Sequence, residues 1–232
     1  MFFPVYDHNR LNHLPRPYVN LAIITANVLI FVLFQGAGEE RAVAASSYSF
    51  GLIPVVFFDI RDLAPQLQML PDWMSLVTYA FLHGNFMHLF GNMLFLWVFG
   101  DNVEDAMGHL RYLLFYLLCA AAGGFVYAIM DVSSDAPLIG ASGAVSGVVA
   151  AYLMLHPRVK VWVLAFGRLP LRLSARWVLG AWIVYQIVNA VIGGDSQVAW
   201  MAHIGGLAAG AVLVVFFRRR GVPLFDRNLG NA

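Results

Sequence analysis

Two side chains that could carry out acyl-transfer chemistry lie inside apolar segments about sixty residues apart. Ser142 follows Gly140 and Ala141 at the start of one apolar segment, and His203 lies inside another. Nucleophilic and ionisable side chains are costly at membrane depth, so their presence there is by default a functional hypothesis. A serine hydroxyl becomes a good nucleophile when an adjacent base takes its proton. The pair therefore predicts a serine hydrolase whose active site lies within the bilayer.

A third apolar segment carries two more polar side chains with helical spacing. His88 and Asn92 are separated by four residues, so they share one face of a helix. Hydrogen-bond donors of this kind can stabilise the negative charge that develops on a carbonyl oxygen during acyl transfer. We therefore expect His88, Asn92 and the backbone N–H of Ser142 to form an oxyanion site. The aspartates of the expected outer loops lie away from this depth, which predicts a Ser–His dyad without a third carboxylate.

The composition predicts an all-α integral membrane protein. Of 232 residues, 60% are hydrophobic and 12% are charged, whereas a soluble domain has about a quarter charged residues. A membrane-spanning helix needs about 20 mostly apolar residues, and six segments approach this length. The predicted spans are residues 19–34, 75–99, 110–130, 142–155, 177–192 and 198–217. This gives a cytoplasmic arm (1–18), a six-helix domain (19–217) and a cytoplasmic basic tail (218–232).

The distribution of positive charge predicts the orientation of these spans. With the N-terminus in the cytoplasm, only Arg41 and Arg61 of the 14 Lys and Arg residues fall outside. Because cytoplasmic loops carry an excess of Lys and Arg, both termini are expected inside. No cleavable signal or targeting segment is recognisable, which favours a bacterial cytoplasmic membrane as the location.

Two loops have patterns of their own. The long outer loop, residues 35–72, contains the apolar but interrupted stretch 50–60, which favours a segment half sunk in the outer membrane interface. In the inner loop, alternating valines and leucines between residues 159 and 173 predict a short β-hairpin. An irregular interfacial segment would give a similar pattern.

The helical rise predicts that the candidate nucleophile and base lie at one depth. At 1.5 Å per residue, Ser142 stands about 21 Å and His203 about 22 Å above the inner ends of their spans. His203, Gly206 and Gly210 share one face of their helix, and Gly143 and Gly147 give the Ser142 span a face of small residues. Small faces let membrane helices approach closely, so these two spans should pack against each other.

Each residue also has a simpler interpretation. Ser142 could be only a helix N-cap, which serine favours. His203, His88 and Asn92 could be only polar groups that hold helices together by hydrogen bonds. A zinc site made of His83, His88 and His203 is disfavoured, because the H-E-x-x-H pattern is absent and no carboxylate is expected at that depth. The agreement in depth favours the catalytic interpretation.

Taken together, these motifs resemble the rhomboid intramembrane serine proteases over roughly residues 18–217. The resemblance rests on the His83–His88–Asn92 segment HGNFMHLFGN, the Gly100–Glu104–Gly108 turn, the GASG of residues 140–143, and Ala202–His203 followed by Gly206 and Gly210. It implies a six-span fold with a Ser–His dyad in an outward-opening, water-filled cavity. It also implies a membrane-embedded lobe in the first outer loop and a lateral substrate entrance beside the fifth span.

One position departs from the family pattern. Members often place an aromatic residue one helical turn after the nucleophile, where it supports the base, but this chain has Ser146 there. Support for His203 must then come from another residue or be looser. Glu104 is expected to pair or cap at a helix boundary, and Trp200 to anchor a helix end.

The predicted function is cleavage of single-span transmembrane proteins near their outward end, with a small residue before the cut. The expected partners are such substrates and the lipid bilayer, and no cofactor, metal or nucleic acid is expected. The alternative is a non-catalytic rhomboid-like scaffold that binds client transmembrane helices, against which the Ser142–His203 pair argues. A small transporter is disfavoured, because paired broken helices in two related halves are not evident.

Overall fold

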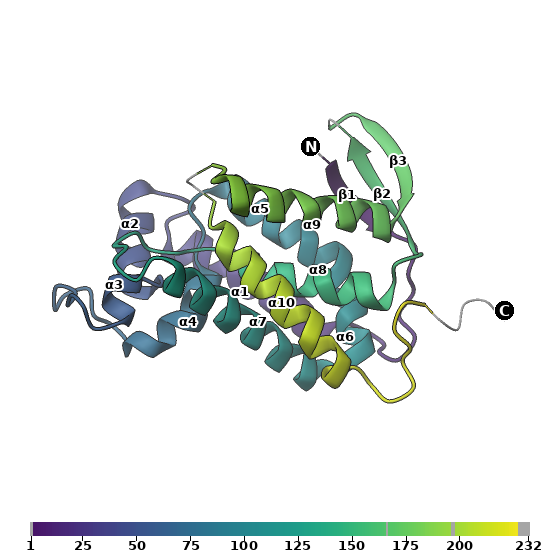
Figure 1. Cartoon of the computed structure of the whole chain (residues 1–232), viewed down its shortest axis with the longest axis horizontal. Helices are drawn as coiled ribbons and strands as arrows, with labels where there is room; N and C mark the ends of the chain where they lie inside the picture. Colours follow the sequence, from purple (N-terminus) through teal and green to yellow (C-terminus); the bar gives the residue numbers. More distant parts are fainter. Residues whose placement is uncertain (1, 166, 196–197, 227–232) are drawn as a thin grey trace.

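A computed structural model describes residues 2–165, 167–195 and 198–226 of this chain. The chain is mostly helical, with one small sheet at the end of the bundle that also holds both described ends of the chain (Figure 1). The helices are α1 (Tyr18–Leu29), α2 (Glu40–Phe50), α3 (Pro54–Phe57), α4 (Ser75–Thr78), α5 (Phe86–Phe95), α6 (Asp101–Met107), α7 (His109–Met130), α8 (Ser142–Leu155), α9 (Ala175–Ile192) and α10 (Trp200–Phe217). The strands are β1 (Phe2–Asp7), β2 (Lys160–Ala165) and β3 (Leu169–Ser174).

Helices form within all six predicted spans, with a break at residues 82–85 in the second. By length and composition, α7, α9 and α10 could each cross a membrane, and the segments Tyr18–Phe34 and Ser142–Leu155 are shorter apolar helices. A π-helical turn, Ile30–Phe34, continues α1. The chain is thus a mostly helical membrane protein, and the bounds of the short fourth span, residues 142–155, agree with those predicted.

The predicted second span begins later than the sequence indicated. Residues 75–81 form α4 and a 3₁₀ turn, and the chain then leaves the helical path before α5 begins at Phe86. The cause is local, because the side chain of Asn85 accepts a hydrogen bond of 2.8 Å from the backbone N–H of His88 and so caps α5. Apolar residues lie on both sides of the segment 83–85, so hydropathy averaged over a span did not reveal the cap. Consequently His88 lies in the first turn of α5 rather than in mid-helix.

The prediction of an all-α protein is wrong at the end of the bundle that carries a small sheet. β2 and β3 form the antiparallel hairpin that the valine and leucine alternation predicted, and β1 adds a third strand, in the order β1-β2-β3. β1 comes from the arm at residues 1–18, whose short sequence carries no clear alternation. The strand forms because the edge of the hairpin offers it backbone hydrogen-bonding partners, which is a tertiary effect.

At the centre of the bundle, glycines allow the backbones of α8 and α10 to contact each other directly. A Cβ atom on Gly206 of α10 would lie 1.9 Å from the carbonyl oxygen of Gly143 on α8. One on Gly210 would lie 2.2 Å from the carbonyl oxygen of Gly147. Since both pairs advance by four residues, α8 and α10 run parallel and in register. The predicted small-residue packing is confirmed, and α7 lies alongside both helices (Figure 1).

Two adjacent carboxylates on α6 hold the N-terminal arm in place. Glu104 accepts hydrogen bonds from the backbone N–H groups of Val19 (3.0 Å) and Asn20 (2.7 Å), in the first turn of α1. Glu104 is therefore a helix cap supplied from another element, as expected for a residue at a helix boundary. Asp105 accepts from the backbone N–H groups of residues 12–14. Burial alone would raise the pKa of Asp105, but these hydrogen bonds outweigh it and hold that pKa below its ordinary value.

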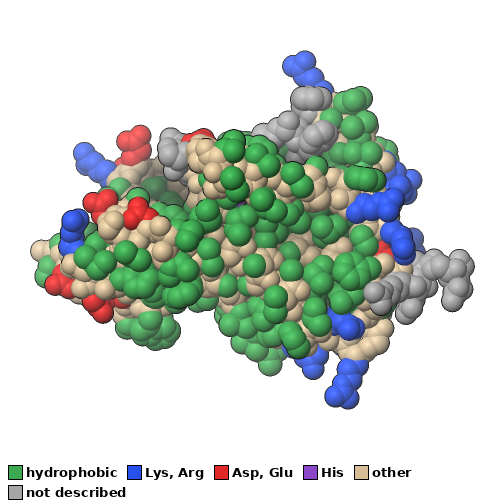
Figure 2. All heavy atoms as spheres, in the orientation of Figure 1, with side chains coloured by type: hydrophobic (Ala, Val, Ile, Leu, Met, Phe, Trp, Pro, Cys, Tyr) green, Lys and Arg blue, Asp and Glu red, His purple; other side chains and the backbone are tan. Residues whose placement is uncertain are grey.

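Charged side chains are separated along the long axis of the molecule. Figure 2 shows Lys and Arg gathered mainly at the end that carries the sheet, and Asp and Glu gathered at the end that carries α2, α3 and α4. Hydrophobic side chains cover most of the surface between the two ends. An apolar belt between charged ends is the surface expected of a protein that lies in a bilayer.

Candidate active site

The structure brings Ser142 and His203 together. The Oγ atom of Ser142 lies 2.8 Å from Nε2 of His203, which is a normal hydrogen-bond length. Ser142 is the first residue of α8 and His203 lies in the first turn of α10. Because the two helices are parallel and in register, their N-terminal ends lie side by side. This geometry allows the imidazole to take the proton of the hydroxyl.

A tight turn before α8 determines where Ser142 begins the helix. Gly140 has φ +121°, which favours glycine, and its N–H donates a 3.0 Å hydrogen bond to the carbonyl of Tyr79. A Cβ atom on Gly140 would lie 2.6 Å from Nε2 of His88, so only glycine allows this approach. Ala141 occupies the N-cap position, and no side chain caps the helix. The interpretation of Ser142 as only an N-cap is therefore wrong.

His88 and Asn92 both lie on α5, and the ring of His88 lies close to Gly140, just before the start of α8. The ring of His88 packs against Gly140, and its Nδ1 atom lies 3.5 Å from the backbone nitrogen of Gly84, a long hydrogen bond in which Nδ1 accepts. This contact favours the tautomer with the proton on Nε2, which lies on the side of the ring that faces Gly140. Asn92 is buried, and its amide donates one hydrogen bond of 3.1 Å to the carbonyl of His88. The amide keeps a second N–H, so both residues retain a donor.

Sequence reasoning missed Gln186, which is the third member of the hydrogen-bonded chain at this site. Its Oε1 atom lies 2.7 Å from Nδ1 of His203, on the opposite side of the ring from Ser142. Gln186 is 3% exposed and lies in the middle of the apolar helix α9. A polar side chain in the middle of a predicted span was the available signal, and it is the same signal that identified His203.

The residues around His203 differ from those that the family pattern suggested. Ser146, at the position where members often have an aromatic residue, is buried and donates a 2.7 Å hydrogen bond to the carbonyl of Ser142. An aromatic contact instead comes from Trp200, whose ring lies edge-on to that of His203 with centroids 5.9 Å apart. Trp200 was expected to be a membrane anchor. Its position indicates that it also limits the movement of the imidazole ring.

His83 does not join the Ser142–His203 pair. It is fully buried, its ring lies edge-on to His88, and neither ring nitrogen has a hydrogen-bond partner among the described residues. Within the described ranges, no group of three or more His, Cys, Asp and Glu side chains is arranged to hold a metal ion.

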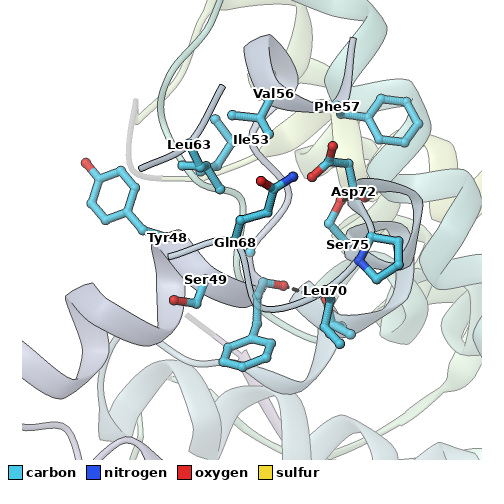
Figure 3. A pocket seen from close by; sticks show the side chains of 14 residues that line it. Tyr48, Ser49, Ile53, Val56, Phe57, Leu63, Gln68, Leu70, Asp72 and Ser75 are labelled. Carbon is cyan, nitrogen blue, oxygen red and sulfur yellow. Dashed lines mark hydrogen bonds between the residues drawn. The ribbon is translucent and has the colours of Figure 1, made fainter. Parts of the chain in front are cut away.

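A separate pocket lies between α2, α3 and α4, in and just after the loop of residues 35–72 (Figure 3). It has about 350 Å³ of empty space, part of which is open solvent, and side chains such as Tyr48, Leu63 and Asp72 line it. Ser142, His203, His88 and Asn92 do not line this pocket. The loop of residues 35–72 thus carries the helices α2 and α3 and borders a small hollow of its own, apart from the Ser–His pair.

The fold and the site together define a class of protein, namely helical membrane proteins with a Ser–His pair between two closely packed helices. Residues 70–220 match the family model described as the Rhomboid domain. This match covers more than half of the chain, so the chain belongs to the rhomboid family.

Several curated proteins are similar to this chain. "RHOMBOID-like protein 12, mitochondrial" of Arabidopsis thaliana is 29% identical over 155 residues, covering 60% of this chain and 44% of that protein. "Putative rhomboid protease YdcA" of Bacillus subtilis is 29% identical over 157 residues, covering 61% of this chain and 66% of that protein. "Rhomboid protease GluP" of the same organism is 33% identical over 142 residues, covering 60% of this chain and 25% of that protein. The chain thus spans less than two thirds of the length of each of these relatives.

Proposed function

We propose that this chain is an intramembrane serine endopeptidase that cleaves transmembrane segments near their outward end with a Ser142–His203 dyad. The observation that carries the proposal is the 2.8 Å contact between Ser142 Oγ and His203 Nε2 at the adjoining ends of α8 and α10. Membership of the rhomboid family, with relatives named as rhomboid proteases, supports the same reaction class.

The mechanism follows from these two side chains. Ser142 Oγ attacks the carbonyl carbon of the scissile bond while His203 Nε2 takes the hydroxyl proton. The tetrahedral intermediate collapses as His203 gives this proton to the leaving amine, which leaves an acyl group on Ser142. A water molecule then attacks the acyl group, with His203 taking its proton. His203 returns this proton to Ser142 Oγ as the ester bond breaks, which releases the carboxylate product and restores the dyad. No cofactor is needed for any of these steps.

The oxyanion of the tetrahedral intermediate needs donors fixed before the reaction starts. His88 and Asn92 on α5, together with the backbone N–H of Ser142, are the groups we propose. The first N–H groups of a helix have no acceptor within the helix, and the positive end of the helix dipole is located there. Both effects favour negative charge beside the start of α8.

We further propose six membrane spans with both termini in the cytoplasm of a bacterial cell. The basic side chains at the sheet end, where both described chain ends also lie, support this orientation (Figure 2). In that orientation Ser142 is in the outer half of the bilayer, and the lobe formed by α2, α3 and α4 is at the outer interface.

The position of the cut in a substrate tests the proposed function. A transmembrane helix satisfies its own backbone groups, so the scissile segment must unwind before Ser142 can reach it. We expect single-span substrates with helix-weakening Gly or Pro to be cut near their outward end, after Ala or another small residue. Mass spectrometry of the products from a reconstituted reaction measures this position. Cuts at the cytoplasmic end, or after bulky residues, would contradict both the orientation and the site.

Replacement of Asn92 tests the oxyanion site. Because the loss of one oxyanion donor typically costs about 10²–10³ in rate, Asn92→Ala should lower kcat by that factor. Asn27→Ala is a matched control, since Asn27 on α1 is also buried and also donates to the carbonyl four residues before it, at 2.8 Å. The control should cleave normally.

Labelling of Ser142 by a small fluorophosphonate probe should persist in Asn92→Ala, and His88→Ala should lose at least as much turnover. If both variants turn over substrate at the wild-type rate, His88 and Asn92 are not oxyanion donors and α5 has only a structural role.

A further inference from the structure

Both ring nitrogens of His203 are engaged by residues from different helices. Nε2 lies 2.8 Å from Ser142 Oγ on α8, and Nδ1 lies 2.7 Å from Gln186 Oε1 on α9. The three side chains thus form one hydrogen-bonded line through the imidazole. We infer that Gln186 is the positioning residue of the candidate site, which holds His203 in the tautomer and orientation that acyl transfer requires. This inference rests on the proposed protease function.

The chemistry of the amide determines which tautomer is selected. The Oε1 atom of glutamine only accepts hydrogen bonds, so its partner Nδ1 must carry the proton. In a neutral imidazole the other nitrogen, Nε2, is then free to accept the proton of Ser142. An aspartate plays the corresponding part in Ser–His–Asp triads. Here an uncharged amide selects the same tautomer, without the cost of placing a carboxylate at membrane depth.

Gln186 is one of the few side chains that α9 buries inside the protein. α9 is the least enclosed of the three long apolar helices, because 17% of its most apolar stretch is buried, against 39% in α7 and in α10. Its buried residues are Ala175, Leu179 and Gln186. A long polar side chain is therefore one of the few groups that α9 directs into the protein, and it meets the imidazole.

Neighbouring residues align the same two helices. Tyr185 on α9 lies edge-on to Trp200 on α10, with ring centroids 5.7 Å apart, and Trp200 in turn lies edge-on to His203. Two adjacent residues of α9 thus contact the first turn of α10. The aromatic contact limits the tilt of the imidazole ring, while Gln186 determines which nitrogen carries the proton.

The test compares two substitutions that differ in the acceptor oxygen. Gln186→Met keeps an unbranched side chain of similar length but removes the strong acceptor, and Gln186→Glu keeps an acceptor oxygen. We expect Gln186→Met to lower kcat about 10–100-fold with KM unchanged, because a base misplaced by about 1 Å can cost about 10²-fold. Gln186→Glu should retain most of the turnover. Asn189→Leu, which removes an amide that donates to the Tyr185 carbonyl on the same helix, should not change kcat.

A spectroscopic measurement separates positioning from simple helix packing. In the full-length protein labelled with ¹⁵N-histidine, the nitrogen shifts of His203, assigned by their loss in His203→Ala, report which nitrogen carries the proton. We expect the proton on Nδ1 in the wild type and a shift towards Nε2 in Gln186→Met. Unchanged kcat and an unchanged tautomer in Gln186→Met would overturn the inference.

This readout also distinguishes the failure of the inference from the failure of the proposed function. If the wild-type protein cleaves nothing, the protease proposal fails, but the tautomer measurement still tests Gln186. If the wild type cleaves and Gln186→Met behaves like Asn189→Leu in both measurements, only the positioning role fails.

Discussion

Ser142→Ala and His203→Ala are each expected to abolish measurable cleavage, with a loss of turnover on the order of 10⁴–10⁶. The reason is that Ser142 Oγ and His203 Nε2 form one functional unit across a 2.8 Å contact, and neither can act alone. Their losses should therefore not add in the double variant. Cleavage of a purified single-span substrate in detergent micelles or liposomes, followed by gel electrophoresis, measures the effect.

A second serine provides the control for this experiment. Ser47 on α2 is also buried, and its hydroxyl donates a 2.7 Å hydrogen bond to the carbonyl of Val43, so Ser47→Ala removes a buried serine far from the dyad in sequence. This variant should cleave normally, and Ser142→Ala should keep the thermal stability of the wild type. A fluorophosphonate probe should label the wild type and not Ser142→Ala. Robust cleavage by Ser142→Ala would refute the mechanism, whereas a wild type that binds transmembrane helices but neither cleaves nor labels would favour the scaffold alternative.

Gly206→Ala is expected to impair both stability and cleavage, because the added methyl group has no room. Its Cβ would lie 1.9 Å from the carbonyl oxygen of Gly143, which is backbone and cannot rotate away. Overpacking of this kind typically costs about 1–3 kcal/mol. Since Gly143 directly follows Ser142, separation of α8 from α10 also lengthens the Ser142–His203 contact, and a displacement of about 1 Å can cost about 10²-fold in rate. Thermal unfolding in micelles and the turnover number measure the two effects.

Gly180→Ala is the matched control for this substitution. Gly180 lies within the apolar helix α9, and a Cβ atom there would meet nothing within 4 Å. The control should keep wild-type turnover and stability. If Gly206→Ala is as active and stable as Gly180→Ala, then α8 and α10 do not need the close contact that the structure gives them.

Local patterns in the sequence predicted the chemistry and much of the helical framework. The bounds of α8 follow from the apolar run after Gly140, and the hairpin of β2 and β3 follows from alternating side chains. The glycines at 206 and 210 predicted a close helix contact, because small residues at a spacing of four lie on one face. These features are readable since each depends on residues close together in the chain.

Other features depend on elements that are distant in sequence, and these were missed or only partly predicted. β1 becomes a strand because β2 offers it an edge, and Glu104 caps α1 from another helix. The expected second span was drawn across Asn85 for a different reason, since the cap that starts α5 is local but apolar residues on both sides of it conceal it. In each case the structure is decided by a hydrogen bond, and hydropathy does not reveal which groups form it.

The candidate site also combines features that local sequence predicts with features that depend on tertiary structure. The sequence by itself determined which groups could react, because a serine and a histidine at one depth follow from residue type and helical rise. Only the tertiary structure decided that the imidazole has a partner on its other nitrogen, since Gln186 reaches His203 from α9 through the packing of two helices. A hydrogen bond between helices depends on their rotation and register, and these are determined by the whole bundle rather than by any one segment.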